Sequence, residues 1–241
     1  MTLAKLQLAL FDDVDLSTIP ESDDTSEKRV VVADRFEPDD SSWPADVFLH
    51  LPPLSFQFIM YDPPWHFATH SAKGQGKGPT QHYRTWTLRK IKSLPIGQLA
   101  AGGAVLMLWG TSPMLLQADR PSRSPMGEVL EALGFRYGAF GGWAKRTRKE
   151  KLRVGTGYVM RSVLEPFLIG ITGSPTHSKA AVNLINGLAR EHSRKPDAAY
   201  RWAEQYMPKA RRIEICARTQ RPGWDVWGDE VGKFQPTGEA T

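Results

Sequence analysis

The chain has 241 residues, of which 41% are hydrophobic, and it contains no run of eighteen apolar residues. This composition is sufficient for the core of one α/β domain and excludes a transmembrane helix. Because the N-terminus lacks a basic flank followed by an apolar core, we expect no secretory signal and a cytoplasmic location. Cys216 is the single cysteine, which excludes an internal disulfide and a cysteine-based zinc site.

Charge is divided unevenly along the chain. Residues 1–50 hold four Lys/Arg and twelve Asp/Glu, a net charge of −8, whereas residues 51–241 hold 27 Lys/Arg and 14 Asp/Glu, a net charge of +13. A basic body is typical of nucleic-acid binders, although a solvated basic surface explains the charge equally well. We expect residues 1–40 to form an acidic, mobile arm, residues 41–235 to form one folded domain, and residues 236–241 to form a tail.

The predicted elements alternate between strands and helices. Apolar runs of strand length occupy, in chain order, residues 55–61, 103–109, 135–144, 165–171 and 211–217. Helices are predicted at residues 87–91, 124–133 and 196–207. Thr87 and Ser124 are suitable cap residues for the first two helices, and apolar residues share one face of the third. Strands that alternate with helices indicate an α/β fold with a mostly parallel sheet covered on both faces.

The tetrapeptide Asp62-Pro63-Pro64-Trp65 directly follows the first of these strands. Ligand chemistry in open α/β sheets gathers at such strand ends. The two prolines stiffen the turn and lack an N–H, which predicts outward carbonyls that are free to accept hydrogen bonds. A carboxylate and a carbonyl can together accept both hydrogens of an exocyclic amino group, and the Trp65 ring can stack on the attached heterocycle. The alternative is a rigid turn with a buried tryptophan.

The segment from Glu214 to Glu230 follows the last predicted strand and is dense in carboxylates, arginine and tryptophan. Carboxylates at a sheet edge suit ribose hydroxyls and an α-ammonium group, and a nearby arginine suits an α-carboxylate. Packing at the end of the fold is the alternative explanation for the tryptophans.

Two loops are rich in basic residues. The segment from His66 to Trp86 alternates glycine with lysine but is no P-loop, because no Gly-Lys-Ser/Thr follows. The segment 145–153 contains six Lys/Arg and one Glu. We expect both loops to flank the 62–65 turn and to bind nucleic-acid phosphates through Lys73, Lys77, Lys145, Arg146, Arg148, Lys149, Lys151 and Arg153. A solvated surface loop is the alternative. His66 and His70 lie in a loop without a third ligand, so we expect no metal site.

Four blocks of the sequence occur together in a fixed order. They are Asp62-Pro63-Pro64-Trp65, then Gly155-Thr156-Gly157-Tyr158 with Glu165 in the next strand, then Ser193-Arg194-Lys195-Pro196-Asp197, and finally residues 214–230. In these blocks the chain resembles the MT-A family of S-adenosylmethionine-dependent adenine-N(6) methyltransferases, over about residues 45–232. The resemblance implies a Rossmann-like methyltransferase fold that is circularly permuted, so that the catalytic strand precedes the cofactor strand.

The same resemblance implies roles for individual residues. It places Asp62, Pro63, Pro64 and Trp65 at the target amino group and base. It implies S-adenosylmethionine as the cofactor, bound by Asp46, Val47, Asp62, Glu214, Cys216 (through its backbone), Arg218, Asp229 and Glu230. Asp229 and Glu230 stand where eukaryotic relatives carry amides, and Leu164 stands where some relatives carry a lysine. Arg218 is therefore expected to bind the cofactor carboxylate.

The resulting prediction is methyl transfer from S-adenosylmethionine to the exocyclic amine of adenine in nucleic acid, with DNA favoured over RNA. In a duplex the base has to leave the stack to reach such a site. The alternatives are an RNA adenine methyltransferase, a catalytically silent nucleic-acid-binding subunit of the same fold, and a basic α/β domain of another function. We expect no membrane association, and the sequence leaves a monomer and a homodimer as alternatives.

Overall fold

The computed structural model describes residues 38–66, 84–116, 123–155, 160–190 and 194–234. Residues 1–37 of the arm expected at 1–40 and the tail expected at 236–241 lie outside these ranges, as do Lys73 and Lys77. Within the described residues, no helix is both long and apolar enough to cross a membrane.

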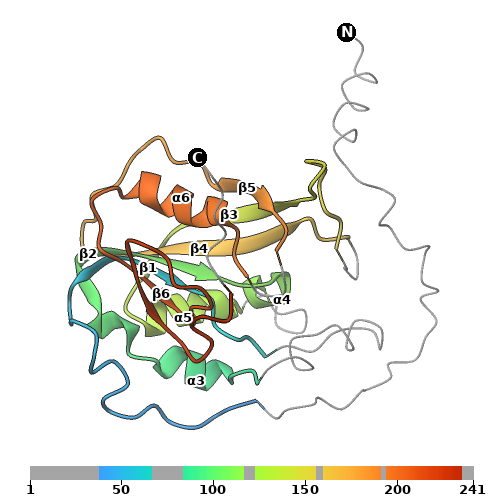
Figure 1. Cartoon of the computed structure of the whole chain (residues 1–241). Helices are drawn as coiled ribbons and strands as arrows, with labels where there is room; N and C mark the ends of the chain where they lie inside the picture. Colours follow the sequence, from blue (N-terminus) through green and yellow to red (C-terminus); the bar gives the residue numbers. More distant parts are fainter. Residues whose placement is uncertain (1–37, 67–83, 117–122, 156–159, 191–193, 235–241) are drawn as a thin grey trace, which may run out of the picture.

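The described residues contain a seven-stranded sheet in the order β5-β3-β4-β2-β1-β6-β7 (Figure 1). The strands are β1 (Phe56–Tyr61), β2 (Ala100–Trp109), β3 (Arg136–Arg146), β4 (Leu164–Thr172), β5 (Leu184–Leu188), β6 (Arg212–Ile215) and β7 (Trp224–Trp227). Four neighbouring pairs are parallel, and β4 runs antiparallel to both β2 and β3. The predicted α/β fold with a mostly parallel sheet is confirmed.

Helices cover both faces of the sheet (Figure 1). The helix α6 (Asp197–Tyr206) lies on one face, and α3 (Leu88–Ser93) and α5 (Pro125–Ala132) lie on the other, with the short elements η3 (Ile96–Gln98) and α4 (Ser112–Leu115). Side chains alternate along β1, as a strand requires. Ile59 and Tyr61 pack in the cluster that contains α3 and α5, whereas Phe58 and Met60 pack in the cluster that contains α6.

The predicted strands and helix starts agree with the structure. The Thr87 side chain accepts a hydrogen bond from the Lys90 N–H and begins α3, and the Ser124 hydroxyl does the same for the Gly127 N–H in α5. The strands β5 and β7 and the helix α4 were not predicted. The strand β3 also continues to Arg146, so that the basic loop begins two residues later than expected.

Candidate active site

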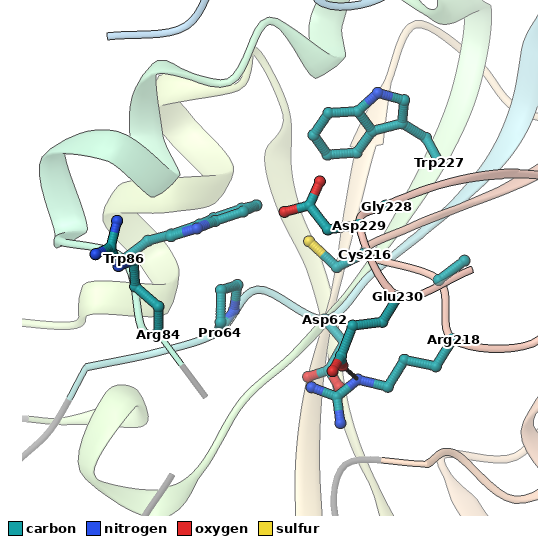
Figure 2. Close-up of a pocket in the computed structure, with 11 residues that line it drawn as sticks. Asp62, Pro64, Arg84, Trp86, Cys216, Arg218, Trp227, Gly228, Asp229 and Glu230 are labelled. Atoms are coloured by element: carbon teal, nitrogen blue, oxygen red, sulfur yellow. Dashed lines mark ion pairs between the residues drawn. The ribbon is translucent and has the colours of Figure 1, made fainter. Parts of the chain in front are cut away.

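Three parallel strands end side by side at one edge of the sheet. Tyr61 of β1 pairs with Ile215 of β6, which pairs with Trp227 of β7. Because parallel strands point the same way, the residues that follow them meet at a common edge. A cavity of about 240 Å³ opens there (Figure 2). It is lined by Asp62, Pro64, Arg84, Trp86, Cys216, Ala217, Arg218, Trp227, Gly228, Asp229 and Glu230.

The backbone at Cys216 and at Gly228 shapes the wall of this cavity. Cys216 has a φ of 63°, in the left-handed region, and the Ala217 N–H donates to the Trp227 carbonyl at 3.0 Å. A Cβ on Gly228 would lie 2.9 Å from the Ala217 nitrogen, so only glycine allows the two strand-end turns to approach this closely. This contact brings Asp229 and Glu230 to the cavity that Asp62 also lines.

Asp62 lies beside a buried lysine. The Nζ atom of Lys195 is 2.8 Å from Asp62 Oδ2, and it also forms an ion pair with Glu165 Oε1. The Lys195 side chain is only 4% exposed, and its Nζ lies 4.8 Å from the centre of the Trp109 ring. On the far side of Glu165, Lys145 Nζ contacts Oε2 at 2.7 Å. Two carboxylates and two ammonium groups therefore alternate from the cavity to the end of β3.

Burial and pairing oppose each other in this cluster. Burial raises the pKa of Asp62, and the Lys195 ammonium partly offsets that effect. Burial also raises the pKa of Glu165, but the attraction of Lys195 and Lys145 outweighs it and lowers this pKa to about 2. Burial would lower the pKa of Lys195, yet Asp62 and Glu165 raise it above its usual value. Lys195 therefore stays protonated between the two carboxylates.

The 62–65 turn is more closely integrated into the core than the sequence predicts. The Pro63 carbonyl accepts a hydrogen bond from the Trp65 N–H at 2.8 Å, and the Pro64 carbonyl accepts one from the Trp86 N–H at 2.9 Å. The expectation of free, outward carbonyls is therefore wrong, because neighbouring backbone donors use them. Trp65 is only 5% exposed, and its indole N–H donates to the Trp109 carbonyl at 2.9 Å. Its ring packs in the core and does not present an open face.

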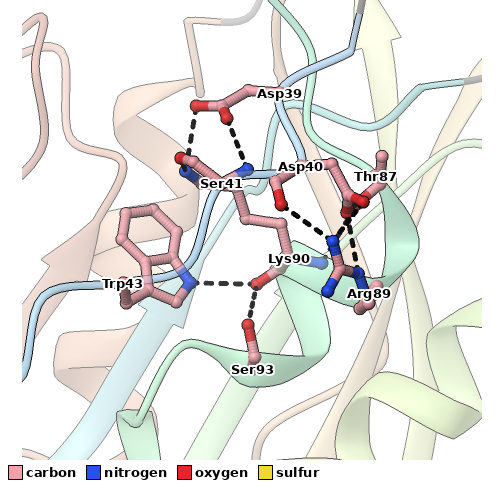
Figure 3. A network of polar contacts seen from close by, with 8 residues as sticks. All are labelled: Asp39, Asp40, Ser41, Trp43, Thr87, Arg89, Lys90 and Ser93. Atoms are coloured by element: carbon pink, nitrogen blue, oxygen red, sulfur yellow. Dashed lines mark hydrogen bonds and ion pairs between the residues drawn. The ribbon is translucent and has the colours of Figure 1, made fainter.

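Tryptophans form the other walls of the cavity. Trp86 and Trp227 both line it, and the ring of Trp43 meets each of them edge to face, at 4.9 and 5.8 Å between centroids. Trp43 is held by Lys90, whose ammonium lies 4.2 Å from its ring centre and whose carbonyl accepts the indole N–H (Figure 3). Lys90 also contacts Asp39 Oδ2 at 2.9 Å. Residues 38–43 thus brace the aromatic side of the cavity against α3.

The structure brings together only part of the cofactor set implied by the sequence. Asp62, Cys216, Arg218, Asp229 and Glu230 all line the cavity. Asp46 is exposed in a turn and does not line the cavity, and Val47 packs against the core cluster that contains α3 and α5. Arg218 Nε contacts Glu230 Oε2 at 3.0 Å, so this arginine already has a carboxylate partner.

Glu214 also lies away from the cavity. Its neighbours Ile213 and Ile215 face α3 and α5, so strand alternation turns Glu214 toward α6. There its two carboxylate oxygens each accept the Tyr200 hydroxyl at 3.0 Å. Burial raises the pKa of Glu214 to about 7, and the Tyr200 hydrogen bonds only partly oppose this.

The basic segment after β3 forms a tight hairpin. The Thr147 N–H donates to the Lys151 carbonyl at 2.8 Å, and the Arg153 N–H donates to the Lys145 carbonyl at 2.7 Å. Four of its predicted phosphate-binding residues are exposed, namely Arg148, Lys149, Lys151 and Arg153. Arg146 instead contacts the Asn186 side chain and the Glu150 carbonyl, and Lys145 faces Glu165.

Several residues of the site were missed by the sequence analysis. Lys195 and Glu165 both stand in the sequence blocks that resemble the family, but the sequence pattern indicates no role for either. Arg84, Trp86 and Trp227 line the cavity without having been predicted. Among the described residues, no group of three or more His, Cys, Asp or Glu side chains could hold a metal ion.

Comparisons with known proteins point to one family. The sequence model of the family described as MT-A70 matches residues 56–230. An Arabidopsis thaliana protein named N(6)-adenosine-methyltransferase MT-A70-like is 28% identical over 182 residues, which are 73% of this chain and 24% of that protein. The type II methyltransferase M.MunI from a Mycoplasma species is 25% identical over 205 residues, which are 77% of this chain and 82% of that protein.

A third relative is a fungal protein. The N6-methyladenosine RNA methyltransferase MTA1 of Pyricularia oryzae is 30% identical over 188 residues, which are 75% of this chain and 48% of that protein. The chain therefore spans less than half of the Arabidopsis and Pyricularia proteins but most of M.MunI.

The packing of Trp65 predicts a structural role. Replacing Trp65 with Phe leaves the buried Trp109 carbonyl without its donor, which should lower the free energy of unfolding by about 1–3 kcal/mol, and the smaller ring adds a cavity cost. Trp202→Phe is the matched control, because the Trp202 indole donates to the Val182 carbonyl in an exposed site where water can replace it. Urea unfolding that shows equal losses for both variants would contradict this role.

The environment of Glu214 predicts a dependence of stability on pH. Because its folded pKa of about 7 exceeds the usual value of 4.5, the folded protein binds more protons than the unfolded chain between these pH values. Stability from this group is present below pH 4.5 and is lost as the pH rises to 7, by about 3 kcal/mol. The difference in unfolding free energy between wild type and Glu214→Gln should change accordingly, and a difference that stays constant with pH would exclude this effect.

Proposed function

This chain belongs to the MT-A70 family, and we propose that it transfers a methyl group from S-adenosylmethionine to the exocyclic amine of adenine in a nucleic acid. The observation that carries the proposal is the Asp62 carboxylate, which stands at the end of β1, lines the cavity and is paired with the buried Lys195. A carboxylate that lines the cavity and is paired with a buried ammonium group suits a reaction that depends on orienting an amine.

The residues around the cavity fit the proposed cofactor. Asp229 offers carboxylate oxygens for ribose hydroxyls, and Arg84 offers a guanidinium group for a carboxylate. Arg218 and Glu230 also line the cavity, where they form an ion pair with each other. Trp86 and Trp227 provide aromatic surface for a purine ring. Burial raises the pKa of the Cys216 thiol well above its usual value, so this side chain stays neutral and contributes an apolar contact.

Asp62 has the central role in the proposed chemistry. S-adenosylmethionine supplies an electrophilic methyl group when it is bound. The adenine amine is a poor nucleophile because its lone pair is delocalised into the ring. By accepting one N–H of the amine, the Asp62 carboxylate would fix the nitrogen. The Pro63 carbonyl already accepts the Trp65 N–H, and Pro63 is buried and does not line the cavity. The reaction then needs neither a metal ion nor a covalent intermediate with the protein.

We propose that the exposed side of the basic hairpin binds the phosphates of the nucleic acid. Arg148, Lys149, Lys151 and Arg153 are exposed on a segment that begins at the end of β3, and the Lys145–Glu165 ion pair links that segment to Asp62 through Lys195. We place DNA first as the substrate, since M.MunI is matched over most of its length, and RNA second, since the fungal relative is named for RNA. A catalytically silent subunit is disfavoured by the presence of Asp62 in its strand-end position.

Substitution of Asp62 tests the chemistry. We expect Asp62→Asn to lower methyl transfer by about 10²–10³-fold, because the charged acceptor is lost, while the fold is retained. The measurement is mass spectrometry of N6-methyladenine in unmethylated genomic DNA and in total RNA after incubation with S-adenosylmethionine. The control is Asp225→Asn. Asp225 lies on β7 and forms an exposed ion pair with Arg211. Turnover by Asp62→Asn that equals the control would refute the mechanism.

Neutralisation of the hairpin tests the polymer contact. Each phosphate contact that is lost should reduce the slope of log affinity against log salt by about one. The triple change Arg148→Gln, Lys149→Gln and Lys151→Gln should therefore flatten the salt dependence of DNA and RNA binding, whereas calorimetric affinity for S-adenosylmethionine should stay the same. Unchanged salt slopes would show that the hairpin is not the polymer contact.

A further inference from the structure

The ion pairs beside Asp62 form a continuous chain that ends at Lys145. Lys145 lies near the end of β3, Glu165 near the start of β4, Lys195 just before α6, and Asp62 just after β1. The contacts run from Lys145 to Glu165 at 2.7 Å, then to Lys195, and then to Asp62 at 2.8 Å. Four segments that are distant in sequence thus meet through one alternating row of charges.

Lys145 differs from the other basic residues of its segment. Its side chain is 36% exposed, and its Nζ contacts Glu165 and lies 4.9 Å from the centre of the Trp143 ring. Residues 148, 149, 151 and 153 are exposed instead. Trp143 pairs with Glu165 across β3 and β4, so the sheet register itself brings the Lys145 ammonium beside the Glu165 carboxylate.

The Glu165 carboxylate forms ion pairs with the ammonium groups of Lys145 and Lys195. The Lys195 ammonium forms ion pairs with the carboxylates of Glu165 and Asp62. Without Lys145, the full charge of Glu165 would act on Lys195. The Lys195 ammonium would then be drawn toward Glu165 and away from Asp62. Asp62 would lose part of the attraction that keeps it ionised and oriented at the cavity.

We propose that Lys145 is a positioning residue for methyl transfer, which acts through Glu165 and Lys195 to hold the Asp62 carboxylate in place, and that it is not a phosphate contact. The inference rests on the proposed function of Asp62. It separates Lys145 from the exposed hairpin residues, with which sequence analysis had grouped it.

The groups that face Asp62 decide how its titration responds. They are Tyr61 of β1, Lys195 before α6, Glu165 of β4, Glu214 of β6, and Cys216 and Arg218 in the turn after β6. Loss of Lys145 leaves the negative charge of Glu165 less compensated and draws Lys195 away, and both effects raise the pKa of Asp62. Asp62 would then be protonated over more of the acidic range, so the acid limb of the kcat profile moves to higher pH.

The test is a comparison of steady-state kinetics on whichever polymer the wild-type enzyme methylates. Lys145→Met should lower kcat about tenfold, leave the KM for polymer nearly unchanged, and shift the acid limb of kcat to higher pH. Lys145→Arg should restore most of the rate because it keeps the charge. Lys149→Met should show the reverse pattern, in which the KM for polymer changes more than kcat, and Lys209→Met, an exposed lysine outside the site, serves as the neutral control.

A double-mutant cycle distinguishes an effect that the ion pairs transmit from a general loss of structure. If the chain of charges carries the effect, Lys145→Met should cause little further loss in a Glu165→Gln background. Should Lys145→Met fail to unfold cooperatively, Lys145→Gln takes its place in the same cycle. A change in KM alone, or kcat and acid limb equal to wild type, would overturn the proposal. If the wild type methylates neither DNA nor RNA, the proposed function fails, and this inference fails with it.

Discussion

The ion pairs of the buried Lys195 ammonium group are the interactions on which the proposed active site depends. Without Lys195, the Asp62 and Glu165 carboxylates would repel each other, and burial would disfavour the charged form of each. Lys195 contacts both and is itself almost fully enclosed, next to the Trp109 ring. Loss of Lys195 would leave two carboxylates without their shared partner, which is destabilising, whereas loss of the Asp62 charge alone would leave Lys195 paired with Glu165. The arrangement therefore ties the ionisation of Asp62 to the packing of three other segments.

The order of strands explains how the two halves of the site meet. The strand β1 is the first described strand and β6 and β7 are the last two, yet they are neighbours and run parallel. Asp62 and the 228–230 turn therefore leave the same edge, although more than 160 residues separate them in the sequence. Gly228 then permits the final approach of the two turns after β6 and β7.

Sequence patterns predicted those parts of the protein that depend on local chemistry. The strand before Asp62, the apolar strand ending at Trp109, and the caps at Thr87 and Ser124 are local signals. The strands β5 and β7 were missed, because they are only five and four residues long and contain Asn186, Gly187 and Asp225. In so short a strand one or two polar or glycine residues remove the apolar pattern, whereas the equally short β6 keeps it with Ile213 and Ile215.

The missed or misplaced site residues share a different cause. Glu214 was assigned to the cofactor, but the direction of its side chain depends on which face of β6 meets α6, which the sequence does not specify. Trp65 was expected to receive a base, but its indole donates to the Trp109 carbonyl, 44 residues away. The role of Lys195 depends on the meeting of residues 62, 165 and 195. The placement of each of these three side chains depends on tertiary contacts.

The central claim is that Lys195 offsets the effect of burial on the Asp62 carboxylate, and so favours its ionised form and orients it toward an amine. It is tested most directly by carbon-13 NMR titration of the Asp62 carboxyl group in the wild type and in Lys195→Met, with Lys209→Met as a control. Our account predicts that the Asp62 carboxyl titrates at clearly higher pH in Lys195→Met than in the wild type, because burial then acts without the neighbouring ammonium. The same titration midpoint in all three proteins would contradict it.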